Sequence, residues 1–164
     1  MIFTVFDTQQ GYRALLSAMA EPGTVQPLPG GLPLVLATLV DHEVRVAEVG
    51  EPHWPDADFL MVRGGTSHGQ LTDARQGTPL DPAAGATAIY ELAAVGAGPL
   101  ALSLTGPGVG AAPRLLRLTG LDSDEVELFQ ATRAHYPCGV DIILVDRNGR
   151  CAALPRSTTI RRVA

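Results

Sequence analysis

The sequence predicts a single domain of mixed α/β class, formed by residues 1–164, with an antiparallel hairpin near one end. Three observations support this fold class. Apolar residues recur at helical spacing near the N-terminus, short apolar segments flanked by glycine or proline follow in the middle, and an Asn-Gly turn joins two apolar runs near the C-terminus. No internal repeat, charge block or low-complexity linker divides the chain, and a chain of this length usually forms one domain.

The N-terminal half is predicted to contain two helices and two strands. Helical spacing indicates a helix over residues 8–20, which the proline and glycine at positions 22 and 23 end. The apolar run 32–40 fits either a buried helix or a buried strand. We favour the helix, because a clearer strand over 44–49 follows it. Residues 50–58 are predicted to form a surface loop, and 59–63 a buried strand ended by two glycines.

The C-terminal half is predicted to be richer in strands. A short polar helix over 68–76 and a connection over 77–85 precede strands over 87–95, 100–105 and 115–119. Asp122, with Glu125 three residues later, resembles a capping box and predicts a helix to about residue 134 that buries Val126 and Phe129. A strand over 140–145, a turn over 146–149 and a strand over 151–154, ended by Pro155, then form the hairpin.

All twelve basic side chains are arginine, so the 164 residues contain no lysine. A Schiff base with pyridoxal phosphate needs a lysine amine, and a Walker A loop needs a lysine that reaches the outer phosphates of a nucleotide. The composition therefore excludes both chemistries and leaves arginine to bind anions. A net charge of -5 without a basic cluster argues against nucleic-acid and membrane-surface partners.

The remaining composition is typical of a cytoplasmic protein. The N-terminus has neither a basic region nor a long apolar stretch, so we expect no signal peptide and no membrane span. Two cysteines, Cys138 and Cys151, are too few for a disulfide framework. Charged residues make up only 18% of the chain and hydrophobic residues 46%, which suggests that a partner covers some apolar surface.

Two further patterns are interpreted as structural. Residues 106–111 fit the G-x-G-x-x-A pattern of a dinucleotide site, which also needs a helix that begins there. Pro113 and a predicted strand follow instead, so a glycine-rich turn between adjacent strands is preferred. The four histidines and two cysteines lack the short paired spacing of a zinc site, and no metal is assigned. Cys138 is interpreted as a small buried residue rather than a nucleophile.

The segment 155–159 places Arg156 between a proline and three hydroxyl residues. It could bind phosphate or carboxylate through bidentate and hydroxyl hydrogen bonds. The alternative is a strand end whose arginine pairs with Asp141, a carboxylate at the start of an otherwise apolar strand that needs a buried partner. From the residues alone, the ion pair is the preferred interpretation, and the anion site remains open.

Three stretches carry a resemblance to a known family. They are YRALLSAMAEPGT at 12–24, LTGPGV at 104–109, and GVDIIL at 139–144 joined through the hairpin to LPRSTT at 154–159. AGAT at 84–87 adds a weaker fourth. From about residue 6 to 160, the chain resembles the PhnH subunit of the bacterial carbon–phosphorus lyase system. It departs from that family between residues 49 and 78, which look shorter than usual, and at Cys138 and Ser157.

The resemblance implies a role in phosphonate use. It implies a homodimer that associates with PhnG, PhnI and PhnJ, while PhnL acts in the same pathway. Together with PhnG, PhnI and PhnL, such a subunit is needed to make ribose 1-phosphonate 5-triphosphate from ATP and a phosphonate. The resemblance also implies a fold similar to the large domain of pyridoxal-phosphate transferases, without that or any other cofactor. No catalytic residue is carried over.

Two functions follow as alternatives. In the preferred one, the chain is an architectural subunit with no activity of its own. In the other, Arg156, Thr158, Asp141 and Arg13 contribute an anion-binding site at a dimer or subunit interface. An independent small-molecule enzyme is disfavoured, because no nucleophile–base pair, metal cluster or cofactor motif stands out.

Overall fold

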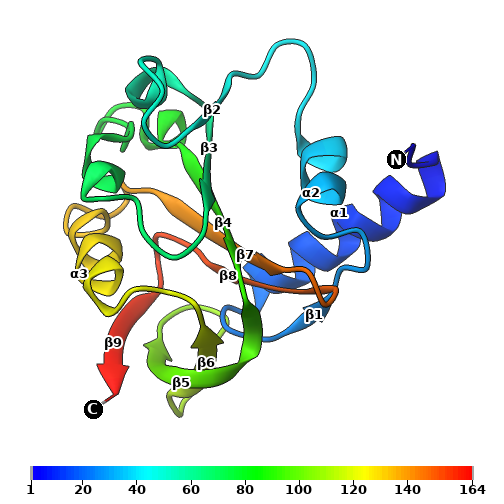
Figure 1. The fold of residues 1–164 in the computed structure, drawn as a ribbon. Helices are drawn as coiled ribbons and strands as arrows, with labels where there is room; N and C mark the ends of the chain where they lie inside the picture. Colours follow the sequence, from blue (N-terminus) through cyan, green and yellow to red (C-terminus); the bar gives the residue numbers. More distant parts are fainter. Residues whose placement is uncertain (1, 164) are drawn as a thin grey trace.

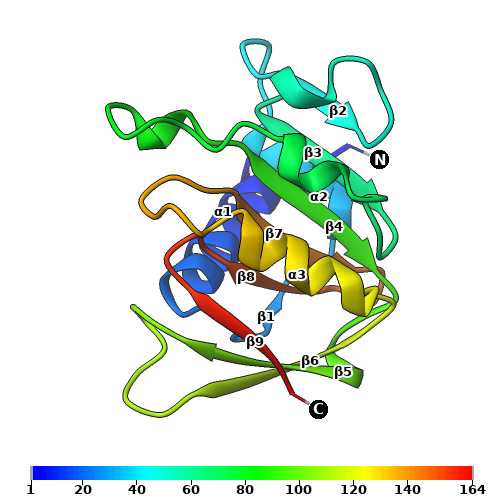
Figure 2. The ribbon, with the colours of Figure 1, turned by 90° about the vertical axis from the view of Figure 1, so that its left-hand side faces the viewer.

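A six-stranded mixed sheet lies at the centre of the computed structural model, which describes residues 2–163 (Figure 1). Helices α1 and α2 cover one face of this sheet, and α3 and a three-stranded sheet lie on the other face (Figure 2). The helices are α1 (Val5–Ala20), α2 (Gly31–Leu39) and α3 (Ser123–Ala131). The strands are β1 (Gln26–Pro27), β2 (Val46–Glu48), β3 (Phe59–Arg63), β4 (Thr87–Leu92), β5 (Ala94–Thr105), β6 (Arg114–Thr119), β7 (Asp141–Asp146), β8 (Arg150–Leu154) and β9 (Thr159–Val163).

The central sheet has the strand order β1-β8-β7-β4-β3-β2. Strands β2, β3, β4 and β7 are parallel to their neighbours, whereas β8 is antiparallel to β7 and β1 is antiparallel to β8. The amino ends of the parallel strands meet at one edge, where Phe59 pairs with Thr87 and Thr87 pairs with Asp141. This register brings the AGAT motif beside the start of the GVDIIL motif.

Strand β7 separates two hydrophobic cores, because successive side chains of a strand point to opposite faces. Ile143 and Val145 pack in the core below α1 and α2. Ile142 and Leu144 pack in the larger core, which also contains Phe129 of α3 and apolar side chains of β5 and β6. A strand buried on both faces has a continuous apolar sequence, which explains why the pattern at 140–145 does not alternate.

The three-stranded sheet has the order β6-β5-β9 and is antiparallel. The sequence predicted one strand over 87–95 and another over 100–105, but the break lies at Ala93, between β4 and β5. The glycines at 96 and 98 instead belong to β5, whose register with β6 shifts between Val95 and Leu100. A bulge of this kind bends a strand without ending it, and glycine in an apolar run marks a bulge as well as a turn.

Helix α1 begins at Val5, three residues before the predicted start. Thr4 Oγ1 accepts a hydrogen bond from the Asp7 amide at 3.1 Å, and the Asp7 carboxylate accepts one from the Thr4 amide at 2.8 Å. This reciprocal pair is a capping box with Asp in place of Glu. The predicted start lay too far along the chain because it relied on apolar spacing, whereas polar residues determine where this helix begins.

The capping box predicted for α3 was wrong in its second half. Asp122 is the N-cap and accepts a hydrogen bond from the Asp124 amide at 3.0 Å. The Glu125 side chain, only 2% exposed, instead accepts hydrogen bonds from the amide and hydroxyl of Ser67 and from the Tyr90 hydroxyl. A buried carboxylate needs such donors, and they hold Glu125 away from the cap.

Helix α3 buries Val126 and Phe129 as predicted, but it ends at Ala131 rather than near residue 134. Helix α2 is confirmed, as are the strand β3 and the hairpin of β7 and β8. The predicted helix over 68–76 is a 3₁₀ turn, Gln70–Asp73. The predicted surface loop 50–58 contains the buried Trp54, whose indole N–H donates to the Gln70 carbonyl at 3.0 Å.

Strands β1 and β9 were not predicted. β1 is a two-residue strand that includes a proline, and β9 carries four exposed positions that mask its pairing with β5. Across residues 2–163, no helix has both the length and the apolar character that crossing a membrane requires.

Candidate functional site

Arg156 and Asp141 form an ion pair at the amino edge of the parallel strands. Asp141 is the first residue of β7, and Arg156 lies in the turn between β8 and β9. Arg156 Nε is 3.2 Å from Asp141 Oδ1, Nη2 is 3.1 Å from Oδ2, and the Arg156 amide donates to Oδ1 at 2.8 Å. Arg156 Nη1 also donates to the Pro82 carbonyl at 2.6 Å. The predicted ion pair is therefore confirmed, and together with the bond to Pro82 it occupies three of the five guanidinium hydrogens.

Two glycines allow the Arg156 side chain to lie in this position. A Cβ on Gly85 would lie 2.7 Å from Arg156 Nη1 and 2.4 Å from the Gly139 carbonyl oxygen. A Cβ on Gly139 would lie 3.0 Å from the Arg156 Cβ, and the φ of Gly139, 153°, also disfavours other residues. The AGAT and GVDIIL motifs therefore meet at Arg156, where each supplies a residue without a side chain.

Thr158 lies two residues further along the same turn. Its amide donates to the Pro155 carbonyl at 2.9 Å, which closes a four-residue turn. Its side chain is buried, with 1% of the residue exposed, and its hydroxyl has no hydrogen-bond partner within residues 2–163. Thr158 and Arg156 line one pocket of about 420 Å³.

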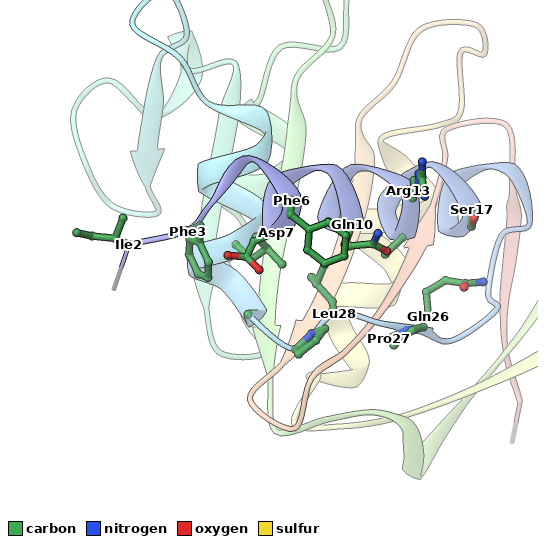
Figure 3. Close-up of a pocket in the computed structure, with 15 residues that line it drawn as sticks. Ile2, Phe3, Phe6, Asp7, Gln10, Arg13, Ser17, Gln26, Pro27 and Leu28 are labelled. Carbon is green, nitrogen blue, oxygen red and sulfur yellow. The ribbon is translucent and has the colours of Figure 1, made fainter.

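Arg13 does not join this group. It lies on the exposed side of α1 and lines a different pocket, of about 690 Å³, between α1 and the segment 26–30 (Figure 3). The structure thus brings together Arg156, Thr158 and Asp141 but places Arg13 elsewhere.

Arg133 joins Arg156, Thr158 and Asp141 in one cluster, although no pattern in the sequence indicated it. It follows α3, and its guanidinium donates to four backbone carbonyls, those of Val140, Leu154, Pro155 and Thr158, at 3.0–3.3 Å. These carbonyls come from the residue before β7, the end of β8 and the turn after β8. Burial lowers the pKa of Arg133 to about 10; Asp141 counteracts this effect and Arg156 adds to it. Arg133 therefore remains a cation at neutral pH.

The pocket of about 420 Å³ contains both arginines and several hydroxyl groups. Its lining residues are Gln130, Arg133, Tyr136, Arg156, Ser157, Thr158, Thr159 and Ile160. Tyr136 also lines a neighbouring pocket of about 430 Å³, together with His135 and Cys138. None of the residues that line the first pocket is acidic, so its chemistry favours an anion.

The remaining motifs pack against the same turn. A Cβ on Gly106 would lie 2.9 Å from the Ser157 carbonyl oxygen, and one on Gly108 would lie 2.2 Å from the Ala20 carbonyl oxygen. Arg114 donates to the Pro22 carbonyl at 2.6 Å and to the Val109 carbonyl at 3.3 Å. The turn after β5 therefore packs against both the end of α1 and the turn after β8. Residues 106–111 lie in the turn between β5 and β6. This agrees with the preferred interpretation of the pattern, a glycine-rich turn rather than a dinucleotide site.

Both cysteines are free and buried, so Cys138 is a small buried residue as interpreted. Among residues 2–163, no group of three or more His, Cys, Asp or Glu side chains could hold a metal ion. The chemistry available in the cluster is therefore that of arginine and hydroxyl groups, which bind oxyanions and fix backbone geometry but do not supply a base near neutral pH.

Comparison with known proteins agrees with the motif pattern. The family model described as "Bacterial phosphonate metabolism protein (PhnH)" matches residues 3–161. The "Putative C-P lyase subunit protein HtxG" of Stutzerimonas stutzeri is 34% identical over 93% of this chain and 85% of its own length. The "Alpha-D-ribose 1-methylphosphonate 5-triphosphate synthase subunit PhnH" of Rhizobium meliloti (strain 1021) is 25% identical over 96% of this chain and 92% of its own length. The chain belongs to the PhnH family of bacterial phosphonate metabolism proteins.

Proposed function

We propose that this chain is an architectural subunit of a carbon–phosphorus lyase system. In that role it acts with PhnG, PhnI and PhnL in making ribose 1-phosphonate 5-triphosphate from ATP and a phosphonate, and it assembles with PhnG, PhnI and PhnJ in the cytoplasm. Membership of the PhnH family and the printed names of two relatives support the pathway. The observation that carries the architectural role is that Arg156 and the motif glycines contact backbone and one carboxylate of this same chain.

The proposal includes a homodimer, and we assign the outer face of α1 to contacts with a second copy. Val5, Tyr12 and Leu16 are large apolar residues on this side of the helix that remain more than half exposed. A two-fold contact places the same patch against itself, and an apolar helix face is complementary to its own copy. Covering this face removes apolar surface from water.

The fold likeness to the large domain of pyridoxal-phosphate transferases is part of the same proposal. The α/β architecture with a mixed sheet supports it. Because the 164 residues contain no lysine, they cannot anchor pyridoxal phosphate as a Schiff base. A scaffold of that type without its cofactor is compatible with an architectural role.

Reconstitution tests the architectural role. The purified chain alone should release no adenine from ATP with methylphosphonate, whereas PhnG, PhnI and PhnL together should require it for that release. Adenine release by the chain alone would contradict the proposal. So would full activity of the other subunits without it.

The α1 assignment is tested by Leu16→Asp, with Leu115→Asp as the matched control. The two leucines are similarly exposed, at 56% and 51%, but Leu115 lies on β6. Leu16→Asp should convert the dimer into a monomer in light scattering, and Leu115→Asp should not. If Leu16→Asp leaves the dimer intact and instead abolishes co-purification with PhnG or PhnI, α1 contacts another subunit.

The second candidate function is anion binding at the Arg156 turn. Arg156→Ala separates the two candidates. Failure of folding or assembly supports the architectural role, since Arg156 is committed to Asp141 and Pro82. Normal assembly with loss of phosphonate-dependent activity supports an anion site.

A further inference from the structure

The charges around the turn after β8 do not balance. Asp141 is the carboxylate in contact with this cluster, and Arg156 already engages both of its oxygens. Arg133, a second guanidinium, donates to neutral carbonyls alone among residues 2–163. One partly buried positive charge is therefore in excess of the single carboxylate. Removing a cation from water is costly unless an opposite charge compensates it.

Two hydrogen-bonding groups in the same place are also unsatisfied. Among residues 2–163, the buried side-chain atoms without a partner are Arg133 Nε and Thr158 Oγ1. Buried polar groups are nearly always hydrogen-bonded, so an unsatisfied pair needs an explanation. Both residues line the pocket of about 420 Å³. The unbalanced charge and the unsatisfied atoms therefore belong to residues that line one cavity.

The lining of the cavity suits an oxyanion with several oxygen atoms. Ser157 and Thr159 add hydroxyl groups on either side of Thr158, and Arg156 retains two guanidinium hydrogens outside its bonds to Asp141 and Pro82. A tetrahedral phosphate or phosphonate group presents three such oxygens, and arginine and hydroxyl groups are its usual partners.

We propose that the pocket lined by Arg133, Arg156 and Thr158 binds a tetrahedral oxyanion of the phosphate or phosphonate class. The Thr158 hydroxyl and the two free guanidinium hydrogens of Arg156 are its donors, and Arg133 contributes positive charge at the pocket wall. The Thr158 hydroxyl lies below the pocket surface, and a rotation of the Thr158 side chain brings it to the anion. That rotation breaks no hydrogen bond, because the hydroxyl makes none within residues 2–163. The site goes beyond the architectural role, because it adds the charge of Arg133 to the free donors of Arg156.

The test uses the purified chain and inorganic phosphate, followed by ¹H–¹⁵N NMR of arginine Nε–H groups. Phosphate should shift the Arg133 Nε–H resonance and the Thr158 amide in a saturable manner, and methylphosphonate should do the same. Arg114 Nε–H, away from this pocket, should not move. Sodium chloride at matched ionic strength should have no effect, because screening alone is not specific.

Thr158→Val is the decisive variant, and Thr158→Ser is its matched control. Valine preserves the shape but removes the hydroxyl, so phosphate affinity should fall about tenfold, as expected for a lost hydrogen bond to an anion. Serine should retain the affinity. Thr158→Val should not lower the urea midpoint, since the hydroxyl is unpartnered, and Thr158→Ser should lower it only by the loss of one buried methyl group. Substituting Arg133 is less informative, because its four carbonyl contacts also hold the fold.

Three results would overturn the site. They are no saturable shift with phosphate or methylphosphonate, binding of acetate but of neither tetrahedral anion, and unchanged affinity in Thr158→Val. Subunit assembly is measured separately, so a failed binding test leaves the architectural role standing. A failed assembly test likewise leaves the binding result intact.

Discussion

The Asp141 carboxylate accepts hydrogen bonds from both the backbone amide and the guanidinium of Arg156. Asp141 starts β7, whereas Arg156 lies beyond the end of β8, in the turn toward β9. The pair therefore connects the central sheet to the strand that enters the three-stranded sheet. Because the two side chains are only 14% and 20% exposed, water does little to replace either partner.

Asp141→Asn should lower the free energy of unfolding by about 2–4 kcal/mol, because it leaves a largely buried Arg156 without its counter-charge. Arg63→Gln is the control, since Arg63 pairs with Glu48 at an exposed position, with side chains 54% and 43% exposed. That substitution should cost less than about 1 kcal/mol. Urea denaturation measures both. Similar losses for the two variants would show that burial adds nothing to the Arg156 pair.

Gly108→Ala should destabilise the chain by about 2–4 kcal/mol. Its φ is +81°, and an added Cβ would lie 2.2 Å from the Ala20 carbonyl oxygen and 2.9 Å from Pro22 Cδ. The turn after β5 would then have to move away from the end of α1. Gly110→Ala is a matched control, because Gly110 also has a positive φ, +96°, but has no atom within 4 Å of the added Cβ. It should cost only about 1–2 kcal/mol of backbone strain. Equal thermal unfolding temperatures for the two variants would contradict the close packing.

Local patterns in the sequence were sufficient to predict α2, β3 and the hairpin of β7 and β8. Each of these has a continuous apolar run bounded by glycine, proline or an Asn-Gly turn, and such signals act over a few residues. The ion pair of Arg156 and Asp141 could also be predicted, because an acid at the start of an apolar strand requires a cation. Its partner lies only fifteen residues away, across a recognisable hairpin.

The contacts of Arg133 and Glu125 could not be predicted from local patterns in the sequence. The partners of Arg133 are backbone carbonyls, and every residue type has a carbonyl, so no pattern of residue types identifies them. Glu125 has the spacing of a capping residue, but Tyr90, 35 positions away, and Ser67, 58 positions away, supply its hydrogen bonds. The error at Glu125 arose because long-range contacts replaced the local one. The only cue for Arg133 was a basic residue just after a helix.

Glu125→Gln should lower the free energy of unfolding by about 1–3 kcal/mol. The amide would place an NH₂ group where the carboxylate accepts hydrogen bonds from Ser67 or Tyr90, leaving one buried donor unsatisfied. Glu127→Gln, at an exposed position of the same helix, should be within about 0.5 kcal/mol of the parent chain. Urea midpoints compare the two variants. An unchanged midpoint for Glu125→Gln would show that the hydrogen bonds of Glu125 contribute little to stability.

The buried Cys151 thiol should make the folded chain less stable as the pH rises into the mildly alkaline range. Burial, followed by the charge of Asp146, raises the pKa of the Cys151 thiol to about 11. The unfolded chain loses this proton above roughly pH 8.5, whereas the folded chain retains it. The unfolded state then binds fewer protons, so stability falls as the pH rises from about 8.5 to about 11, by roughly 2–3 kcal/mol in total.

Urea midpoints at about pH 8 and about pH 10.5 test this pH dependence. Cys151→Ala should show a smaller fall between the two pH values than the parent chain, although removal of the thiol lowers its stability at both. The burial of Tyr90 raises the pKa of that phenol in both chains, so its contribution cancels in the comparison. Cys138→Ala, which retains the Cys151 thiol, should keep the steeper dependence of the parent. Equal slopes in the parent chain and Cys151→Ala would mean that the folded state does not suppress ionisation of this thiol.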